Sequence, residues 1–332
     1  MIKVLSIYLL VIIIAFTTVF SSTANNFLIQ KIYAHIFTLD DTASFLAFAD
    51  QLQVESDLVK TNLINNNLSL AEKHANKAAA LLTPNVEEEI AEKNQKTADD
   101  LLIAVSDLQK ISSSSEKQRQ MVDQLISRIN STLGEAVKVR IEEGQGSSSS
   151  TFLEKGIEFL RGMFGGGGSS SKNTDEGIKP NSTTQALAFA NLVDGILVNY
   201  GNAYAVDFDM TNMSNMVMGG NSMAMSDNNS NNMNMNMSSM MNMDSENKKY
   251  TLVDMTDYQS AQALATKAQE IFNSELKSIA SNKSSAFLTN LESGLTQLNN
   301  LIESKASPMD IMMVVHTQIH PNLLVAYNLK LR

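Results

Sequence analysis

Twelve of the nineteen methionines in the chain lie within residues 210–243, separated mostly by Asn and Ser. Many are spaced as Met-x-Met or Met-x-x-Met. A thioether is a soft, neutral donor that prefers Cu(I) to hard cations, and it has no proton to lose. This pattern predicts a segment that wraps several sulfurs around one soft metal ion. Its predicted ligands are Met210, Met213, Met216, Met218, Met223, Met225, Met233, Met235, Met237, Met240, Met241 and Met243.

Two other interpretations of this methionine-rich segment stay open. It can be a low-complexity loop without a function of its own, or a reservoir of oxidisable sulfur, because methionine sulfoxide formation is reversible. Residues 207–250 show no apolar periodicity and are rich in Asn and Ser. They are therefore expected to form a disordered insert rather than part of a core.

A second group of possible metal ligands lies near the C-terminus. His316 and His320 are four residues apart, so both rings lie on one face of a helix. Methionines precede them on nearly the same stripe, and together they predict a copper site with nitrogen and sulfur ligands; these are Met309, Met312 and Met313. Pro321 follows and predicts a kink, because proline lacks a backbone donor. The alternative is that the stripe belongs to the core.

Composition excludes several other classes of protein. The chain has no cysteine, which removes disulfides, thiolate metal sites and thiol catalysis. The formal net charge of −10 provides no basic surface for nucleic acid. None of the usual hydrolase, nucleotide-binding or di-metal motifs is present, so no enzymatic activity is expected. His74 lies among alanines at helical spacing and is expected to be a hydrogen-bonded core histidine.

The remaining pattern predicts an all-α protein. The chain matches itself at a shift of 190 residues, with Ala71 on Ala261 and Leu101 on Leu291. This similarity predicts an internal duplication, giving two tandem up-down four-helix bundles. The expected organisation is bundle copy 1 over 36–143, a Gly/Ser-rich linker over 144–182 with an amphipathic segment at 152–164, and bundle copy 2 over 183–332 with its Met-rich insert.

Helix boundaries follow from capping residues. Ser69 and Glu72 have the spacing of a capping box, and Thr83 before Pro84 is typical of a helix start. In the second copy we expect helices over Thr184–Ala205, Asp257–Ala280, Ser284–Glu303 and Pro308–Leu329.

The N-terminus has the composition of an export signal. Lys3 precedes an uncharged apolar run from Val4 to Phe20, and cleavage can follow Ala24 or Ala34. Residues 1–34 are therefore a signal peptide or an uncleaved N-terminal anchor. In both cases the remainder is expected outside the cytoplasmic membrane, secreted or anchored, and an uncleaved N-terminus gives membrane contact.

The Tyr33-Ala34-His35 end of the signal, the run from Val315 to Asn322 and the Asn/Met/Ser insert resemble exported helical-bundle proteins of ammonia-oxidising archaea. The resemblance covers most of the chain. It belongs to no family with an established activity and transfers no site residues. The resemblance implies that the protein works in an organism that relies heavily on copper. The bundles also resemble extracytoplasmic domains attached to iron permeases, but the His-x-x-Glu motif of those domains is absent, which argues against iron.

These observations lead to a functional hypothesis with two alternatives. The first is an exported protein that binds copper for buffering or delivery. The second is a structural or interaction module of the cell envelope that binds a protein partner and no metal. The third is an accessory or sensor subunit of a membrane complex.

Overall fold

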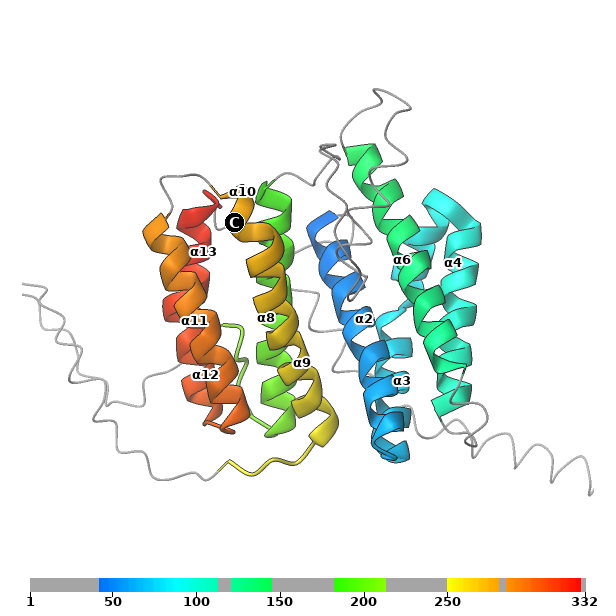
Figure 1. Ribbon diagram of the computed structural model, residues 1–332, viewed down its shortest axis with the longest axis horizontal. Coiled ribbons are helices and arrows are strands. Elements are labelled where there is room, and N and C mark those ends of the chain that lie inside the picture. Colours follow the sequence, from blue (N-terminus) through cyan, green and yellow to red (C-terminus); the bar gives the residue numbers. More distant parts are fainter. Residues whose placement is uncertain (1–41, 113–120, 145–181, 213–249, 281–284, 330–332) are drawn as a thin grey trace, which may run out of the picture.

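The computed structural model describes residues 42–112, 121–144, 182–212, 250–280 and 285–329 (Figure 1). Within these ranges the chain forms helices and connecting turns and no strand, so the predicted all-α class is confirmed. The N-terminal signal or anchor, nearly all of the linker with its 152–164 segment, and residues 213–249 of the insert lie outside the described residues.

The described helices fall into two groups along the chain. The first helical unit comprises α2 (Thr42–Ile64), α3 (Leu68–Leu81), α4 (Pro84–Ser112) and α6 (Val122–Gly144). The second helical unit begins with α8 (Ser182–Ala203) and α9 (Met255–Ile271), which continues through η5 (Phe272–Leu276) and α10 (Lys277–Ile279). It ends with α11 (Ser285–Glu303) and the continuous run α12 (Pro308–Val314), η7 (Val315–Ile319) and α13 (His320–Ala326).

A polar side chain caps the start of four of these helices, α3, α4, α9 and α12. The Thr83 hydroxyl accepts from the backbone N–H of Val86, as predicted, and the Ser307 hydroxyl accepts in the same way from that of Asp310. The predicted capping box at Ser69 is wrong. Helix α3 begins one residue earlier, and the side chain of Asn67 accepts from the N–H of Leu70 instead. Asn67 follows a turn in which Asn66 has a positive φ of 57°, and this turn places Asn67 at the N-terminal end of α3.

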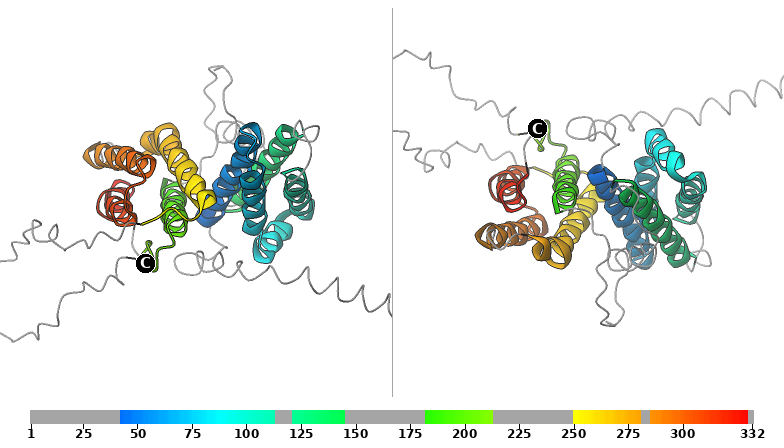
Figure 2. Two further views of the ribbon diagram at one scale, coloured as in Figure 1. Left: turned by 90° about the horizontal axis from the view of Figure 1, so that it is seen from below. Right: turned by 90° about the horizontal axis from the view of Figure 1, so that it is seen from above.

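Helix α2 lies at the centre of the molecule. Each unit has its own apolar cluster, but α2 packs against α3 and α6 on one side and against α8 and α9 on the other (Figures 1 and 2). Of its 23 residues, 17 are buried. Phe48 and Leu52 belong to the first cluster, whereas Val54 belongs to the second. The two units therefore form one packed body.

A buried polar network crosses the boundary between the units. Glu55 of α2 receives a hydrogen bond from the Ser260 hydroxyl of α9 at 2.6 Å, and His74 Nδ1 of α3 lies 2.7 Å from its other oxygen. His74 Nε2 lies 2.9 Å from Oε1 of Gln259, again on α9. His74 is thus the buried, hydrogen-bonded histidine that the sequence predicted.

Lysine charge keeps the Glu55 carboxylate ionised. Burial alone would raise the pKa of Glu55, but the charge of Lys77 and the hydrogen bonds from His74 and Ser260 outweigh it and hold the pKa below its usual value. Burial by itself would lower the pKa of Lys77, because it disfavours the charged ammonium group. Glu55 and Asp257 nevertheless raise the pKa of Lys77, and Asp257 Oδ1 lies 2.7 Å from its Nζ. The two units are therefore joined by a lysine that is shared between a carboxylate of each unit.

Replacing Glu55 with Gln is expected to destabilise the protein by about 2 kcal/mol at pH 7, because the charge-assisted hydrogen bonds to the carboxylate are lost and the partly buried Lys77 keeps only one of its two carboxylate partners. The pKa of Glu55 is lowered from 4.5, so its contribution is present above that pH and is lost as the pH falls. Urea unfolding at pH 7 and at lower pH measures both effects. The exposed Glu92→Gln change on α4 is the control. Equal stability of Glu55→Gln and wild type at pH 7 would contradict this account.

Candidate functional site

The base of the methionine insert lies against the last helix of the second unit. Residues 207–212 fold back onto this unit, and the backbone carbonyl of Met210 lies 2.9 Å from His316 Nε2. The Met210 side chain is only 3% exposed and packs in the second apolar cluster. A Cβ at Gly201 would lie 3.0 Å from the Met210 sulfur, so a larger residue there would force the Met210 side chain to shift. Met210 therefore anchors the insert in the core.

The two predicted histidines of the last helix are brought together. The rings of His316 and His320 are 5.3 Å apart, edge to face. His320 Nε2 lies 3.4 Å from Asp194 Oδ1 on α8, and neither atom has a hydrogen-bond partner among the described residues. Sequence reasoning missed Asp194. The available signal was that Asp194 is the one charged residue in the otherwise apolar and small-residue helix α8.

Burial shifts the pKa values of Asp194 and His320 in opposite directions. It raises the pKa of Asp194 to about 7, and the charge of Asp209 adds to this shift. It lowers the pKa of His320 to about 4, with a further contribution from His316. Between these pH values both side chains are uncharged. The pair is therefore a neutral acid facing a neutral base, rather than an ion pair.

The three methionines predicted as metal ligands on this helix differ in how far they are exposed to solvent. Met312 is fully buried in the second apolar cluster. Met309 and Met313, four residues apart on α12, are 37% and 39% exposed. Among the described residues, no three His, Asp or Glu side chains converge on a metal position. The predicted insert ligands from Met213 to Met243 lie outside the described residues.

The helix is irregular just before Pro321, as expected. The irregularity is a π turn, η7, in which the N–H of His320 donates to the Val315 carbonyl, five residues back. Such turns insert one extra residue into a helix and are frequent at functional sites. The Asn322 side chain donates to the Gln318 carbonyl at 2.5 Å, so this carbonyl is satisfied within the irregular stretch.

Helix α11 holds η7 in place through a glycine contact. A Cβ at Gly294 would lie 3.1 Å from Cγ1 of Ile319 and 3.3 Å from Cβ of Gln318. Both contacts are tighter than ordinary van der Waals distance, and Ile319 is fully buried. Gly294 therefore sets how closely η7, with His316 on it, approaches the rest of the unit.

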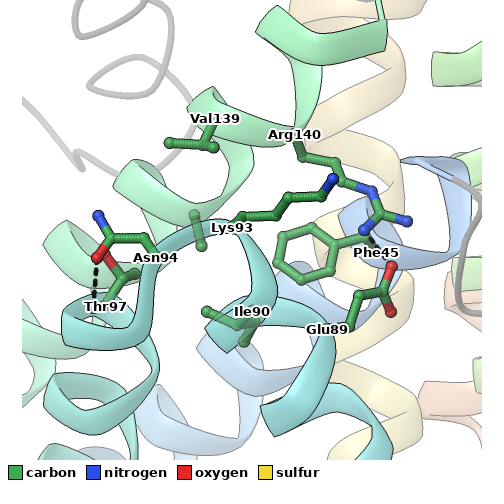
Figure 3. A pocket seen from close by; sticks show the side chains of 9 residues that line it. Phe45, Glu89, Ile90, Lys93, Asn94, Thr97, Val139 and Arg140 are labelled. Atoms are coloured by element: carbon green, nitrogen blue, oxygen red, sulfur yellow. Dashed lines mark hydrogen bonds and ion pairs between the residues drawn. The ribbon is translucent and has the colours of Figure 1, made fainter.

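The first unit contains a small cavity beside a kink in α4 (Figure 3). Asn94 leaves the helical conformation, and its side chain caps the second half of α4 by accepting from the N–H of Thr97. Arg140 forms an ion pair with Glu89 and lies over the ring of Phe45, 5.6 Å from its centre. The volume is about 10 Å³, enough for one water molecule. This cavity is too small for an organic ligand.

No protein-family model, curated protein or solved structure matches the chain. Within the described ranges, none of the helices combines the length and the apolar character that a membrane span requires.

Replacing Gly294 with Ala is expected to destabilise the protein by about 1–3 kcal/mol, because the added methyl group overpacks the contact with Ile319. The matched control is Gly195→Ala on α8. There the new Cβ meets the amide nitrogen at the far end of the Gln51 side chain at 3.0 Å, and an unbranched side chain end adjusts at less cost than the branched Ile319. The gain in helix propensity, up to about 1 kcal/mol, then offsets the cost. Thermal unfolding of the two variants tests the difference, and equal melting temperatures would contradict it.

Proposed function

We propose that this protein is an exported copper-handling protein that buffers or delivers copper outside the cytoplasmic membrane. One observation carries the proposal. The contact between His316 Nε2 and the Met210 carbonyl joins residues 106 positions apart and brings the base of the methionine-rich insert to the histidine pair. The two parts of the chain with copper-ligand chemistry are thus neighbours in space.

The chemistry of the residues near this contact supports the same function. Met309 and Met313 present thioethers on the outer face of α12, and His316 follows on the next turn. Thioethers favour Cu(I), whereas imidazole accepts both Cu(I) and Cu(II). The insert captures Cu(I) through its methionines, and the ordered helix beside its base receives the ion.

We also infer that the two helical units are tandem four-helix bundles that arose by internal duplication. Residues matched at the shift of 190 are buried in both units, and these pairs are Ala71 and Ala261, Ala75 and Ala265, Ala78 and Ala268, Leu101 and Leu291, Leu108 and Leu298, Ile129 and Ile319, Leu133 and Leu323, and Ala136 and Ala326. Common burial at matched positions is what a duplicated core requires.

The test is a Cu(I) titration of the chain against a competing chelator. In the test variant, all methionines from 213 to 243 are replaced by Leu, which keeps the length of the insert and removes its sulfur. In the control variant, an equal number of Asn residues in the insert are replaced by Ser. We expect the wild type and the control to bind several Cu(I) ions. The Leu variant should retain at most the ions bound by the α12 and η7 residues.

A wild-type chain that does not compete with the chelator would overturn the copper function. In that case the second hypothesis, a module of the envelope that binds a protein partner, would take its place. Equal Cu(I) binding by the wild type and the Leu variant would exclude the insert as the capture segment.

A further inference from the structure

Two polar atoms in the second unit lie close together without forming a hydrogen bond. They are Oδ1 of Asp194 on α8 and Nε2 of His320 at the start of α13, and they are 3.4 Å apart. Both atoms are shielded from solvent and have no other partner among the described residues. Buried polar atoms are almost always paired, because leaving one unpaired costs about 1–3 kcal/mol. Two such atoms side by side, close together but not hydrogen-bonded to each other, leave room in the coordination sense for a shared ligand.

The separation of the two atoms suits one kind of ligand. Zinc binds histidine nitrogen and carboxylate oxygen at about 2.0–2.2 Å, and its ligands are arranged as a tetrahedron. Two ligands at these lengths that enclose an angle of about 110° are about 3.4 Å apart. Asp194 and His320 therefore have the spacing of two neighbouring ligands of a tetrahedral ion, without any movement of the helices.

The electrostatic surroundings also favour a cation. Asp209 lies close enough for its charge to act on Asp194, and the second imidazole of His316 is 5.3 Å from that of His320. Within the described part of the chain, no lysine or arginine contributes to the pKa shift of either Asp194 or His320. Other atoms of the two side chains reach the surface, His320 being 21% and Asp194 17% exposed, so the pair lies just below the protein surface.

We propose that Asp194 and His320 form a binding site for one divalent transition-metal ion of the zinc and copper type, Zn(II) or Cu(II). Nitrogen and oxygen donors suit these borderline ions, whereas thioethers suit Cu(I). The site deepens the proposed function, because it gives the oxidised, divalent form of copper a place separate from the methionine-rich insert. Water occupies the remaining positions of the ion.

The experiment titrates Zn(II) into the full chain in the presence of a chromogenic chelator. Asp194→Asn and His320→Gln are each expected to weaken Zn(II) binding at least tenfold. The double variant is expected to be no weaker than the single variants, because each change already removes the site. The control is Asp99→Asn, which removes the same charge from the exposed face of α4. Asp99→Asn should bind Zn(II) as the wild type does.

A second measurement separates loss of a ligand from loss of the fold. Asp194→Asn is nearly isosteric and should melt at or above the wild-type temperature without metal, because burial opposes the charge of Asp194 in the folded protein. The electron paramagnetic resonance spectrum of bound Cu(II) should show one nitrogen ligand fewer in His320→Gln than in the wild type.

Wild-type affinity for Zn(II) in both single variants would overturn the site, as would an unchanged Cu(II) spectrum in His320→Gln. If Zn(II) binding is lost in Asp194→Asn but the insert binds no Cu(I), the site proposed here stands and the proposed capture of copper is rejected. The reverse pattern would reject this site alone. The two proposals therefore fail in distinguishable ways.

Discussion

The ionised carboxylate of Glu55, buried between two sets of helices, constrains the whole structure. A buried charge is tolerated only when its partners are fixed around it. His74 comes from the same unit, but Ser260 comes from the other one, and Lys77 pairs with both Glu55 and Asp257. The second unit therefore has to dock on α2 in one register. The position of α8, and with it Asp194, follows from that register.

Equivalent lysine contacts cross the boundary between the units in both directions. Lys77 of α3 reaches across to Asn199 on α8, with 2.5 Å between Nζ and Oδ1. Lys267, its counterpart at the shift of 190, reaches from α9 to Gln53 on α2 at 3.0 Å. In each case a lysine on the second helix of one unit contacts the first helix of the other. This is the pattern of an isologous dimer interface, in which the same patch is used twice. The proposed internal duplication would account for this reciprocity.

The helices of this protein could be predicted from sequence, whereas the contacts between them could not. Local chemistry determines helix starts at Thr83 and Ser307, and the apolar period determines which faces are buried. The break at Asn94 could not be foreseen, because Asn in an otherwise helical stretch is also common on exposed surfaces. Met210 could not be separated from the other insert methionines, since its burial depends on the space beside Gly201. Asp194 gains its importance only from His320, 126 positions away in sequence, and no spacing rule links the two.

The two ends of the methionine-rich segment are fixed to the same place. On one side Met210 packs on Gly201, and on the other the N–H groups of Val253 and Asp254 both donate to the carbonyl of Ala203. Residues can be added or removed between these anchors without moving a helix. The number of sulfur atoms that the chain carries can therefore change over evolution while the helical scaffold stays the same, so sulfur content and helical architecture are free to evolve separately.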